Sequence, residues 1–487
     1  MTQSKRLINF VLPVTACNFQ CHYCYIGQEH GNTGELGTLD YSPAHIQKAL
    51  TRERLGGVCH INMCGLGETL LAPYAVELAE RMLENGHIVS IVTNGTVRKR
   101  IEELCLLPAL LRERLFFKFS FHFLELRKRA LLDAFFDNVQ YVKGSGCALT
   151  VELTVNDQTV PFIPEVQEIC FQKMGVPCHV IESRNNLDGF SRLTALPVAE
   201  HQRQWGTFHS PLFDFQQTQW MAQRREFCYA GEWVVSLNAG SGWIMPCFAG
   251  GSALQNIYEN VDEPIRFAAI GTNCPWKHCY AAYILLSSGI VPELEAPCYA
   301  DLRDRTCADG STWLTPTVRD AFGGKFSEVN QPYSQEKRCY LDALMALEYA
   351  PNEPETQKKA ARASKAVEIR LLDRGVKTVA VCANRADPPC AWLLSLLAPT
   401  KIRVRYILDS EYVENEDAGS LKNHLKRRCK YFLKLLMGQT PPVVNRYDRV
   451  PKVDAVVVAE YPQLCSVKRR IASCGFARVL ALTELAD

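Results

Sequence analysis

The first part of the chain alternates between short apolar runs and longer amphipathic segments. Runs with the length and residue types of strands occupy 6–14, 58–65, 87–95, 114–122, 147–155 and 177–183. Segments with helical periodicity lie between them, among them 43–54, 72–86 and 125–146. Strands that alternate with helices predict a parallel α/β architecture, here a partial (β/α)6 TIM-like barrel or a wound sheet over residues 1–190. Functional side chains are then expected just past the carboxyl ends of the strands.

The pattern changes after residue 200. Residues 200–310 are rich in Trp, Tyr, Gly and Cys and lose helical periodicity, which predicts a small Cys-rich domain. Residues 311–365 read as a helical connector, with a helix over 333–350 and a polar, Pro-containing linker over 351–368. Residues 366–487 predict a compact Rossmann-like α/β domain, with strands at 376–383, 402–409, 453–460 and 477–484.

Composition narrows the class of protein. With 487 residues, 47% of them hydrophobic and 22% charged, the chain is globular and too long for one core. A formal charge of +2 gives no reason to expect nucleic acid or an anionic membrane as partner. No apolar run approaches the ~18 residues of a membrane span, and the N-terminal run reads as a strand rather than a signal peptide.

The 21 cysteines are the unusual feature of the composition. In a long chain without a signal peptide they indicate a reducing cytoplasm, where clustered cysteines bind metals or act in catalysis. Three of them, Cys17, Cys21 and Cys24, follow the first predicted strand with three and two residues between them. Thiolates bind zinc or iron–sulfur clusters. A structural zinc site needs four protein ligands, so the alternatives are half of a zinc site, a chance cluster, or an iron–sulfur cluster with one open iron.

This spacing resembles the radical S-adenosylmethionine (SAM) superfamily. The resemblance implies a [4Fe–4S] cluster whose open iron binds SAM, and reductive cleavage of SAM to a 5′-deoxyadenosyl radical that abstracts hydrogen from a substrate. It also implies that Tyr23, just before the last cysteine, packs against the adenine of SAM. An external one-electron donor, such as flavodoxin or ferredoxin, is then expected.

Three later segments strengthen the resemblance, which covers residues 6 to about 185. "CGLGETLL" (64–71) is similar to the family's Gly-x-Gly-Glu-Pro-Leu stretch, which implies a SAM-binding role for its glycines and glutamate, although Thr69 replaces the proline. "VTNGT" (92–96) and "FKFSFHF" (117–123) follow the third and fourth strands, and the fifth strand carries a glutamate. Ordinary turns and solvated strand positions remain the alternative for each of them. The candidate SAM contacts are Tyr23, Gly65, Gly67, Glu68, Asn94, Ser120 and Glu152, with His122 as a further possibility.

The second predicted domain resembles the SPASM and twitch auxiliary-cluster domains of the same superfamily. Cys228, Gly242 and Cys247 have the spacing of their opening, around a hairpin turned by "NAGSG". Cys274 and Cys279 follow, which implies a second, auxiliary [4Fe–4S] cluster on Cys228, Cys247, Cys274 and Cys279. The rest of the SPASM pattern is missing, so one twitch-like cluster is favoured, with zinc as the alternative occupant. Possible substitute ligands are Cys298 and Cys307, and His278 is a weaker one.

The remaining features are open. The glycine fingerprint of a dinucleotide site does not follow 376–383, so NAD or FAD is not expected, although Asp409 takes the ribose-binding position. The charged run 299–305 reads as a solvated, salt-bridged face. Cys64 and Cys147 read as buried cysteines, with a thiol facing the barrel as the alternative.

Together these features predict a radical SAM enzyme, and the substrate class is the least determined part. Auxiliary-cluster domains accompany peptide or protein modification, which makes a peptide or protein the first expectation. A sugar or cell-surface glycan precursor is the second. A non-catalytic zinc or iron–sulfur protein is the alternative of another class.

Overall fold

The structure, a computed structural model, divides into two compact units. Met1–Phe267 and Trp276–Pro332 form the first, and Ala268–Pro275 and Tyr333–Asp487 form the second. The residues described are 3–248, 255–265, 267–274, 276, 278–335, 337–339, 341–342, 354–383, 397, 400–409, 443–444, 453, 455–458 and 479–481.

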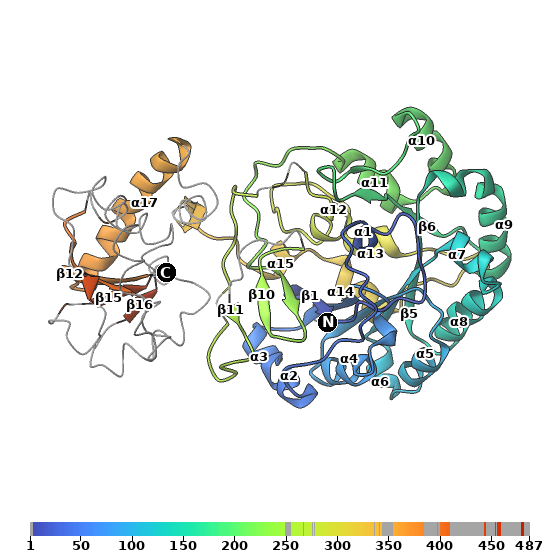
Figure 1. The fold of residues 1–487 in the computed structure, drawn as a ribbon, viewed down its shortest axis with the longest axis horizontal. Coiled ribbons are helices and arrows are strands. Elements are labelled where there is room, and N and C mark those ends of the chain that lie inside the picture. The colour runs from blue at the N-terminus through green and yellow to red at the C-terminus, as the bar shows by residue number, and fades with distance from the viewer. Residues whose placement is uncertain are drawn as a thin grey trace. The chain divides into compact units, whose positions relative to one another are not determined.

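One nine-stranded sheet organises the first unit, in the order β11-β10-β9-β1-β2-β3-β4-β5-β6 (Figure 1). Neighbouring strands from β1 to β6 are parallel, as the alternation of strands and helices predicted. These strands are β1 (Arg6–Leu12), β2 (Cys59–Gly65), β3 (Ile88–Thr93), β4 (Leu115–Ser120), β5 (Ala148–Thr154) and β6 (His179–Ile181). Each lies within a predicted apolar run. Such a sheet, with helices on its outer side, has the architecture of a partial barrel.

Amphipathic helices cover the outer side of this sheet (Figure 1). α4 (Ala75–Glu84) shows why: Leu78, Met82 and their neighbours at helical spacing are buried against the strands, while Glu77 stays exposed. Its companions are α2 (Pro43–Ala49), α3 (Arg52–Leu55), α5 (Arg98–Cys105), α6 (Ala109–Arg112), α7 (Phe123–Lys128), α8 (Leu132–Gly144) and α9 (Ile163–Met174).

Two helices expected to be continuous are broken. The predicted helix 43–54 is α2 and α3, because Thr51 adopts an extended conformation and its side chain caps the second helix by accepting the N–H of Arg54. The predicted helix 125–146 is α7 and α8. Ala130 lies between them with φ of 55°, a left-handed conformation that ends an α-helix, although no Gly or Pro marks the site.

The predicted hairpin at "NAGSG" is confirmed. β9 (Val234–Asn238) and β10 (Trp243–Met245) pair antiparallel, and Gly242 has φ of 86°, which favours glycine. β9 also pairs parallel with β1, and β11 (Gln255–Asn256) pairs with β10. This part of the expected auxiliary region therefore extends the barrel sheet.

Two short helices, α13 (Tyr299–Arg303) and α14 (Pro316–Gly323), lie on the inner side of the sheet (Figure 1). The ring of Phe322 packs 4.5 Å from that of His60 on β2, and Arg303 is 0% exposed. The solvated reading of 299–305 is therefore wrong for Arg303, because α13 turns this side chain towards the barrel and a carboxylate, Glu152, meets it there.

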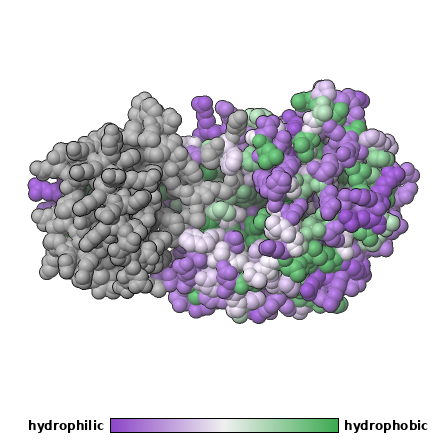
Figure 2. Space-filling model, viewed as in Figure 1, coloured by the Kyte–Doolittle hydropathy of each residue, from purple (hydrophilic) through white to green (hydrophobic). Residues whose placement is uncertain are grey.

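The remaining elements of the first unit are short. They are α1 (Tyr25–Gln28), β7 (Arg184–Asn185), β8 (Ser191–Arg192), α10 (Val198–Trp205), α11 (Pro211–Gln219), α12 (Ala282–Leu285), α15 (Phe326–Val329) and the 3-10 helices Thr69–Leu71, Asp157–Phe162 and Gly206–Phe208. No described helix has both the length and the apolar character that crossing a bilayer requires. On the face shown in Figure 2, polar residues cover most of the first unit and apolar residues form small groups between them.

The second unit contains a parallel sheet in the order β14-β13-β12-β15-β16. Counted along the chain this order is 3-2-1-4-5, as in doubly wound sheets. The strands are β12 (Thr378–Ala383), β13 (Arg403–Asp409), β14 (Val443–Val444), β15 (Ala455–Val458) and β16 (Val479–Ala481). The Rossmann-like assignment stays a prediction, because most connections between these strands, and the side chain of Asp409, lie outside the described residues.

The second unit also contains a 20-residue helix, α17 (Pro354–Asp373). The segment 351–368 was expected to be a linker that leads into a helix, and the helix begins early in it, at Pro354. A proline at the first helical position starts a helix rather than breaking it. The helix expected over 333–350 lies partly outside the described residues.

Candidate functional site

The cysteine loop begins where β1 ends, at the carboxyl edge of the sheet. Cys17 is exposed, and Cys21 and Cys24 are half-buried. The start of the loop is anchored because the N–H groups of Thr15 and Ala16 both donate to the carbonyl of Glu35, at 2.8 and 2.9 Å. The backbone thus presents the three cysteines from one short, tethered segment.

The thiols influence one another electrostatically. Burial, together with the neighbouring Cys24, raises the pKa of Cys21 to about 12. Burial also raises the pKa of Cys17, with Glu68 and Cys24 adding to the effect. Cys17, Cys21 and Cys24 supply three sulfurs from one short loop, and thiolates are the ligands that iron–sulfur clusters use. The donor set therefore fits a [4Fe–4S] cluster, although no three His, Cys, Asp or Glu side chains of the described chain stand in metal-binding geometry.

The two glycines of "CGLGETLL" make room for the start of the cysteine loop. A Cβ on Gly67 would lie 2.1 Å from the carbonyl oxygen of Ala16, and one on Gly65 would lie 2.5 Å from Cγ1 of Val14. The N–H of Glu68 donates to the same Ala16 carbonyl at 2.8 Å. The glycines thus permit a close backbone contact that holds the cysteine loop against the end of β2.

Thr69, which replaces the family's proline, closes this turn. Its Oγ1 accepts the N–H of Gly65 at 3.1 Å. A threonine hydroxyl can thus stabilise the turn without the restricted φ of proline.

Glu68 is 3% exposed and fully engaged with backbone and side-chain donors. Oε1 accepts the hydroxyl of Thr93 at 2.7 Å and the N–H of Leu70 at 3.0 Å, and Oε2 accepts the N–H of Asn94 at 2.7 Å. Burial nevertheless raises the pKa of this carboxyl group. Glu68 therefore joins the loop after β2 to the loop after β3.

Asn94 carries the same network to the cysteine loop. Its Nδ2 donates to Oδ1 of Asn18 at 2.7 Å, and Nδ2 of Asn18 donates to Oγ1 of Thr96 at 2.8 Å. The structure thus brings together Cys17, Glu68 and Asn94, which are far apart in the sequence.

Tyr23 is buried beside the end of β4. Its hydroxyl lies 2.9 Å from Nδ1 of His122, and the two rings are 5.9 Å apart with a tilt of 36°. Burial lowers the pKa of His122 to about 4, so this imidazole is neutral near pH 7. Ser120 ends β4 and is half-buried.

An inward-facing polar row runs beneath this edge of the sheet. Asn62 donates to Asn9 at 2.9 Å and accepts from Ser90 at 2.9 Å, and Cys64 donates to the same Asn9 oxygen at 3.4 Å. Cys64 thus faces the inner side of the sheet, where burial raises its pKa to about 11. Cys147 is instead buried just before β5 begins.

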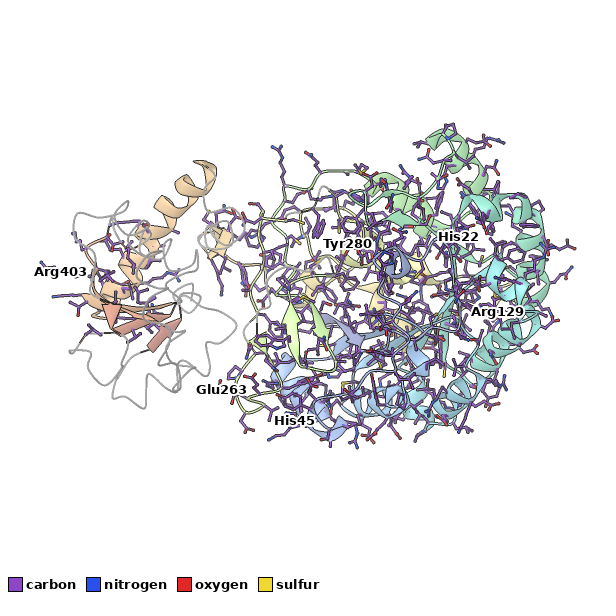
Figure 3. All side chains as sticks on the ribbon, viewed as in Figure 1. His22, His45, Arg129, Glu263, Tyr280 and Arg403 are labelled. Carbon is purple, nitrogen blue, oxygen red and sulfur yellow. The ribbon has the colours of Figure 1, made fainter. Side chains whose placement is uncertain are left out.

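Arg184 connects the two cysteine regions of the first unit. Its guanidinium carbon lies 3.9 Å from the ring centre of Tyr25, the residue after Cys24, and 4.4 Å from that of Tyr280, the residue after Cys279 (Tyr280 is labelled in Figure 3). Such stacking of a guanidinium on aromatic faces is favourable. No pattern in the sequence predicted that Arg184 would stack on both tyrosines.

The four cysteines expected to hold the auxiliary cluster belong to different units. Cys228, Cys247 and Cys279 lie in the first unit and Cys274 in the second, and all four are half-buried. Cys247 and Cys279 lie near enough to Tyr280 to contribute to the raised pKa that burial gives this residue. The four-cysteine set stays a prediction.

Two of the substitute ligands differ in their surroundings. His278 is buried, and neither ring nitrogen has a hydrogen-bond partner among the described residues, as expected of a side chain that lacks its ligand. Cys307 instead accepts a hydrogen bond from Nζ of Lys143 at 3.4 Å. Both stay predicted substitutes, with His278 expected to be the weaker one.

A parallel α/β sheet with a cysteine loop at its carboxyl edge defines an α/β protein with a candidate iron–sulfur centre. Residues 11–154 match the sequence model of the Radical SAM superfamily, so the chain carries a radical SAM domain. The match contains the cysteine loop, Glu68, Asn94 and Glu152. A search of curated protein sequences returned no match.

Solved structures with similar folds cover part of the chain. SuiB of Streptococcus suis, bound to S-adenosylmethionine, is 15% identical with a TM-score of 0.39, over 53% of this chain and 64% of SuiB. Native anSMEcpe with bound AdoMet is 15% identical with a TM-score of 0.37, over 53% of this chain and 79% of the anSMEcpe chain. The chain thus spans less than two thirds of SuiB.

Proposed function

We propose that this protein is a radical SAM enzyme whose SAM-binding cluster is held by Cys17, Cys21 and Cys24. The observation that carries the proposal is the hydrogen-bonded network of Glu68, Asn94 and Asn18, which ties two strand-end loops to the cysteine loop inside a radical SAM domain. When bound, a [4Fe–4S] cluster with an open iron supplies the reductive cleavage of SAM to methionine and a 5′-deoxyadenosyl radical.

The chain's own residues position the cofactors at the carboxyl edge of the sheet. The close backbone contact at Gly65 and Gly67 holds the cysteine loop against the end of β2, where SAM is proposed to bind, and Tyr23 offers an aromatic ring for adenine. Ser120 and Glu152 take the polar positions that the resemblance assigns to SAM contacts. Glu68 acts mainly as a positioning residue, since three of its lone pairs already accept protein donors.

The proposed substrate is a peptide or protein, and a sugar or glycan precursor is the second candidate. The support is the twitch-like cysteine spacing of 228–279, which accompanies peptide modification in the superfamily. Cys228, Cys247, Cys274 and Cys279 are proposed to hold an auxiliary [4Fe–4S] cluster. An external one-electron donor and a cytoplasmic location complete the proposal.

The test is SAM cleavage by the full chain. The protein is reconstituted anaerobically with iron and sulfide, reduced with dithionite, and assayed for 5′-deoxyadenosine. We expect product from the wild type and none from a variant with Cys17, Cys21 and Cys24 all replaced by Ala. A Cys339→Ala variant, which changes an exposed cysteine outside both predicted sets, should keep activity. Product formation by the triple variant would contradict the proposal.

A further inference from the structure

The inner side of the barrel holds a group of charged and hydroxyl side chains, the interior cluster, formed by Lys118, Thr150, Glu152, Tyr283, Tyr299 and Arg303. Lys118 and Thr150 are register partners on β4 and β5, and Glu152 lies two residues further on the same face of β5. Tyr299 and Arg303 lie one helical turn apart on α13. Two strands and a helix of the first unit therefore converge on one place.

Arg303 is the centre of this cluster. Nη1 forms an ion pair with Oε1 of Glu152, while Nε and Nη2 have no hydrogen-bond partner among the described residues. The guanidinium carbon lies 5.1 Å from the ring centre of Tyr283 and 5.0 Å from that of Tyr299. A buried guanidinium with free donors is costly, so it implies a ligand that accepts from them.

The neighbouring hydroxyl groups point to the same conclusion. Oγ1 of Thr150 and Oη of Tyr299 are buried and have no partner in the part of the chain described. Nζ of Lys118, which is 6% exposed, has one long contact, 3.5 Å to Oδ1 of Asn62. These three groups therefore have unused hydrogen-bonding capacity on the inner side of the sheet.

The charges of the cluster do not balance. Burial raises the pKa of Tyr283, and Lys118, Arg303 and Arg184 oppose this shift while Glu152 alone adds to it. His60 adds no charge, because burial and the nearby Lys118 and Arg303 keep its pKa well below its ordinary value. The interior cluster itself thus contains two basic side chains, Lys118 and Arg303, and one carboxylate, Glu152. SAM has a net positive charge, so it does not correct this excess.

We propose that the interior cluster binds a carboxylate of the substrate, with Arg303 and Lys118 as the anion-binding side chains and Tyr299 and Thr150 as hydroxyl donors. This inference rests on the proposed function and names its substrate class: a peptide that presents an Asp or Glu side chain. Lys118 lies deeper than the cofactor edge, since it comes two residues before the end of β4, and Glu152 is shared between the cluster and the proposed SAM contacts. Arg pairs with a planar carboxylate through two parallel N–H donors, and Nε and Nη2 supply such a pair.

The test uses the reconstituted full chain saturated with SAM and two probes, N-acetylglutamate N-methylamide and its neutral glutamine analogue, in a calorimetric titration. We expect a preference for the glutamate probe of about tenfold or more, as a charge-assisted buried hydrogen bond implies. Arg303→Gln and Lys118→Met should each reduce this preference by about tenfold, and Glu152→Gln should strengthen binding of the glutamate probe. Lys118→Met keeps the test decisive if Arg303→Gln does not fold.

Controls separate the other outcomes. Arg319→Gln changes a half-exposed arginine of α14 that pairs with Asp301 and Asp304, and it should leave probe binding unchanged. Equal binding of both probes to the wild type would overturn the inference. A second result would also overturn it: Arg303→Gln loses affinity for SAM, and the glutamate probe displaces SAM from the wild type. The cluster would then bind the carboxylate of SAM rather than that of the substrate. Deoxyadenosine formation tests the proposed function separately, so either idea can fail alone.

Discussion

The carboxylate of Glu68 accepts the backbone N–H of Asn94 at 2.7 Å, and this bond joins two loops of the proposed SAM site. The residues are 26 positions apart and meet because β2 and β3 are parallel neighbours whose carboxyl ends share one edge. Glu68 therefore links the carboxyl ends of β2 and β3.

Glu68→Gln should lower the free energy of unfolding by about 2 kcal/mol. The amide group would place donors opposite at least one of the N–H or O–H donors that the carboxylate now accepts, which leaves a buried group unpaired. Urea denaturation of both proteins measures the change. Glu168→Gln removes an exposed carboxylate on α9 and should change stability by less than about 0.5 kcal/mol. Equal stability of Glu68→Gln and wild type would sink this account of Glu68.

Gly67→Ala should lower stability by about 1–3 kcal/mol, because the added methyl group would meet the Ala16 carbonyl at 2.1 Å. The displaced cysteine loop should also bind less iron on reconstitution. Gly144→Ala is the matched control: it lies in α8, where a Cβ has no neighbour within 4 Å, and it should be neutral or stabilising by up to about 1 kcal/mol. The account fails if both variants take up iron like the wild type.

His87 should give stability a pH dependence. Nδ1 accepts the N–H of Cys59 at 3.1 Å, Nε2 lies 2.8 Å from the carbonyl of Leu50, and burial lowers the pKa to about 4. The unfolded chain therefore binds a proton at higher pH than the fold does. Neutral His87 therefore contributes on the order of 3 kcal/mol to the free energy of unfolding. This contribution is complete above about pH 6.5 and is lost as the pH falls towards 4.

His87→Gln should flatten the stability profile between pH 7 and pH 4, although its stability at pH 7 will itself be lower. His30→Gln, at an exposed position, should keep the wild-type slope. A slope that His87→Gln leaves unchanged would show that this imidazole does not titrate as proposed.

Two substitutions of Tyr23 distinguish the role of its hydrogen bond from that of its aromatic ring. Tyr23→Phe removes the bond to His122 but keeps the ring, so SAM affinity should change by less than about threefold. Tyr23→Leu removes the ring and should weaken SAM binding by about tenfold or more. Equilibrium dialysis with labelled SAM measures both. If Tyr23→Leu binds SAM as the wild type does, the ring does not contact adenine.

The sequence predicted β1 to β6 well because each is a short apolar run, and it predicted the cysteine loop because ligand spacing is local. Contacts made by packing were not predictable. Arg303 lies in a charged run that resembles a surface, and only the entry of α13 into the barrel buries it. The break at Ala130 has no Gly or Pro to mark it. Lys118 and Glu152, each within an otherwise apolar strand, were available hints of a polar interior.

The most direct measurement of the central claim is the iron content of two reconstituted proteins, the wild type and the variant with Cys17, Cys21 and Cys24 replaced by Ala. The account predicts that the variant holds about four fewer irons per chain, one cluster less. It also predicts about eight irons in the wild type if the auxiliary cluster forms. Equal iron in both proteins, or zinc in place of iron, would contradict the claim that the cysteine loop holds a SAM-binding cluster.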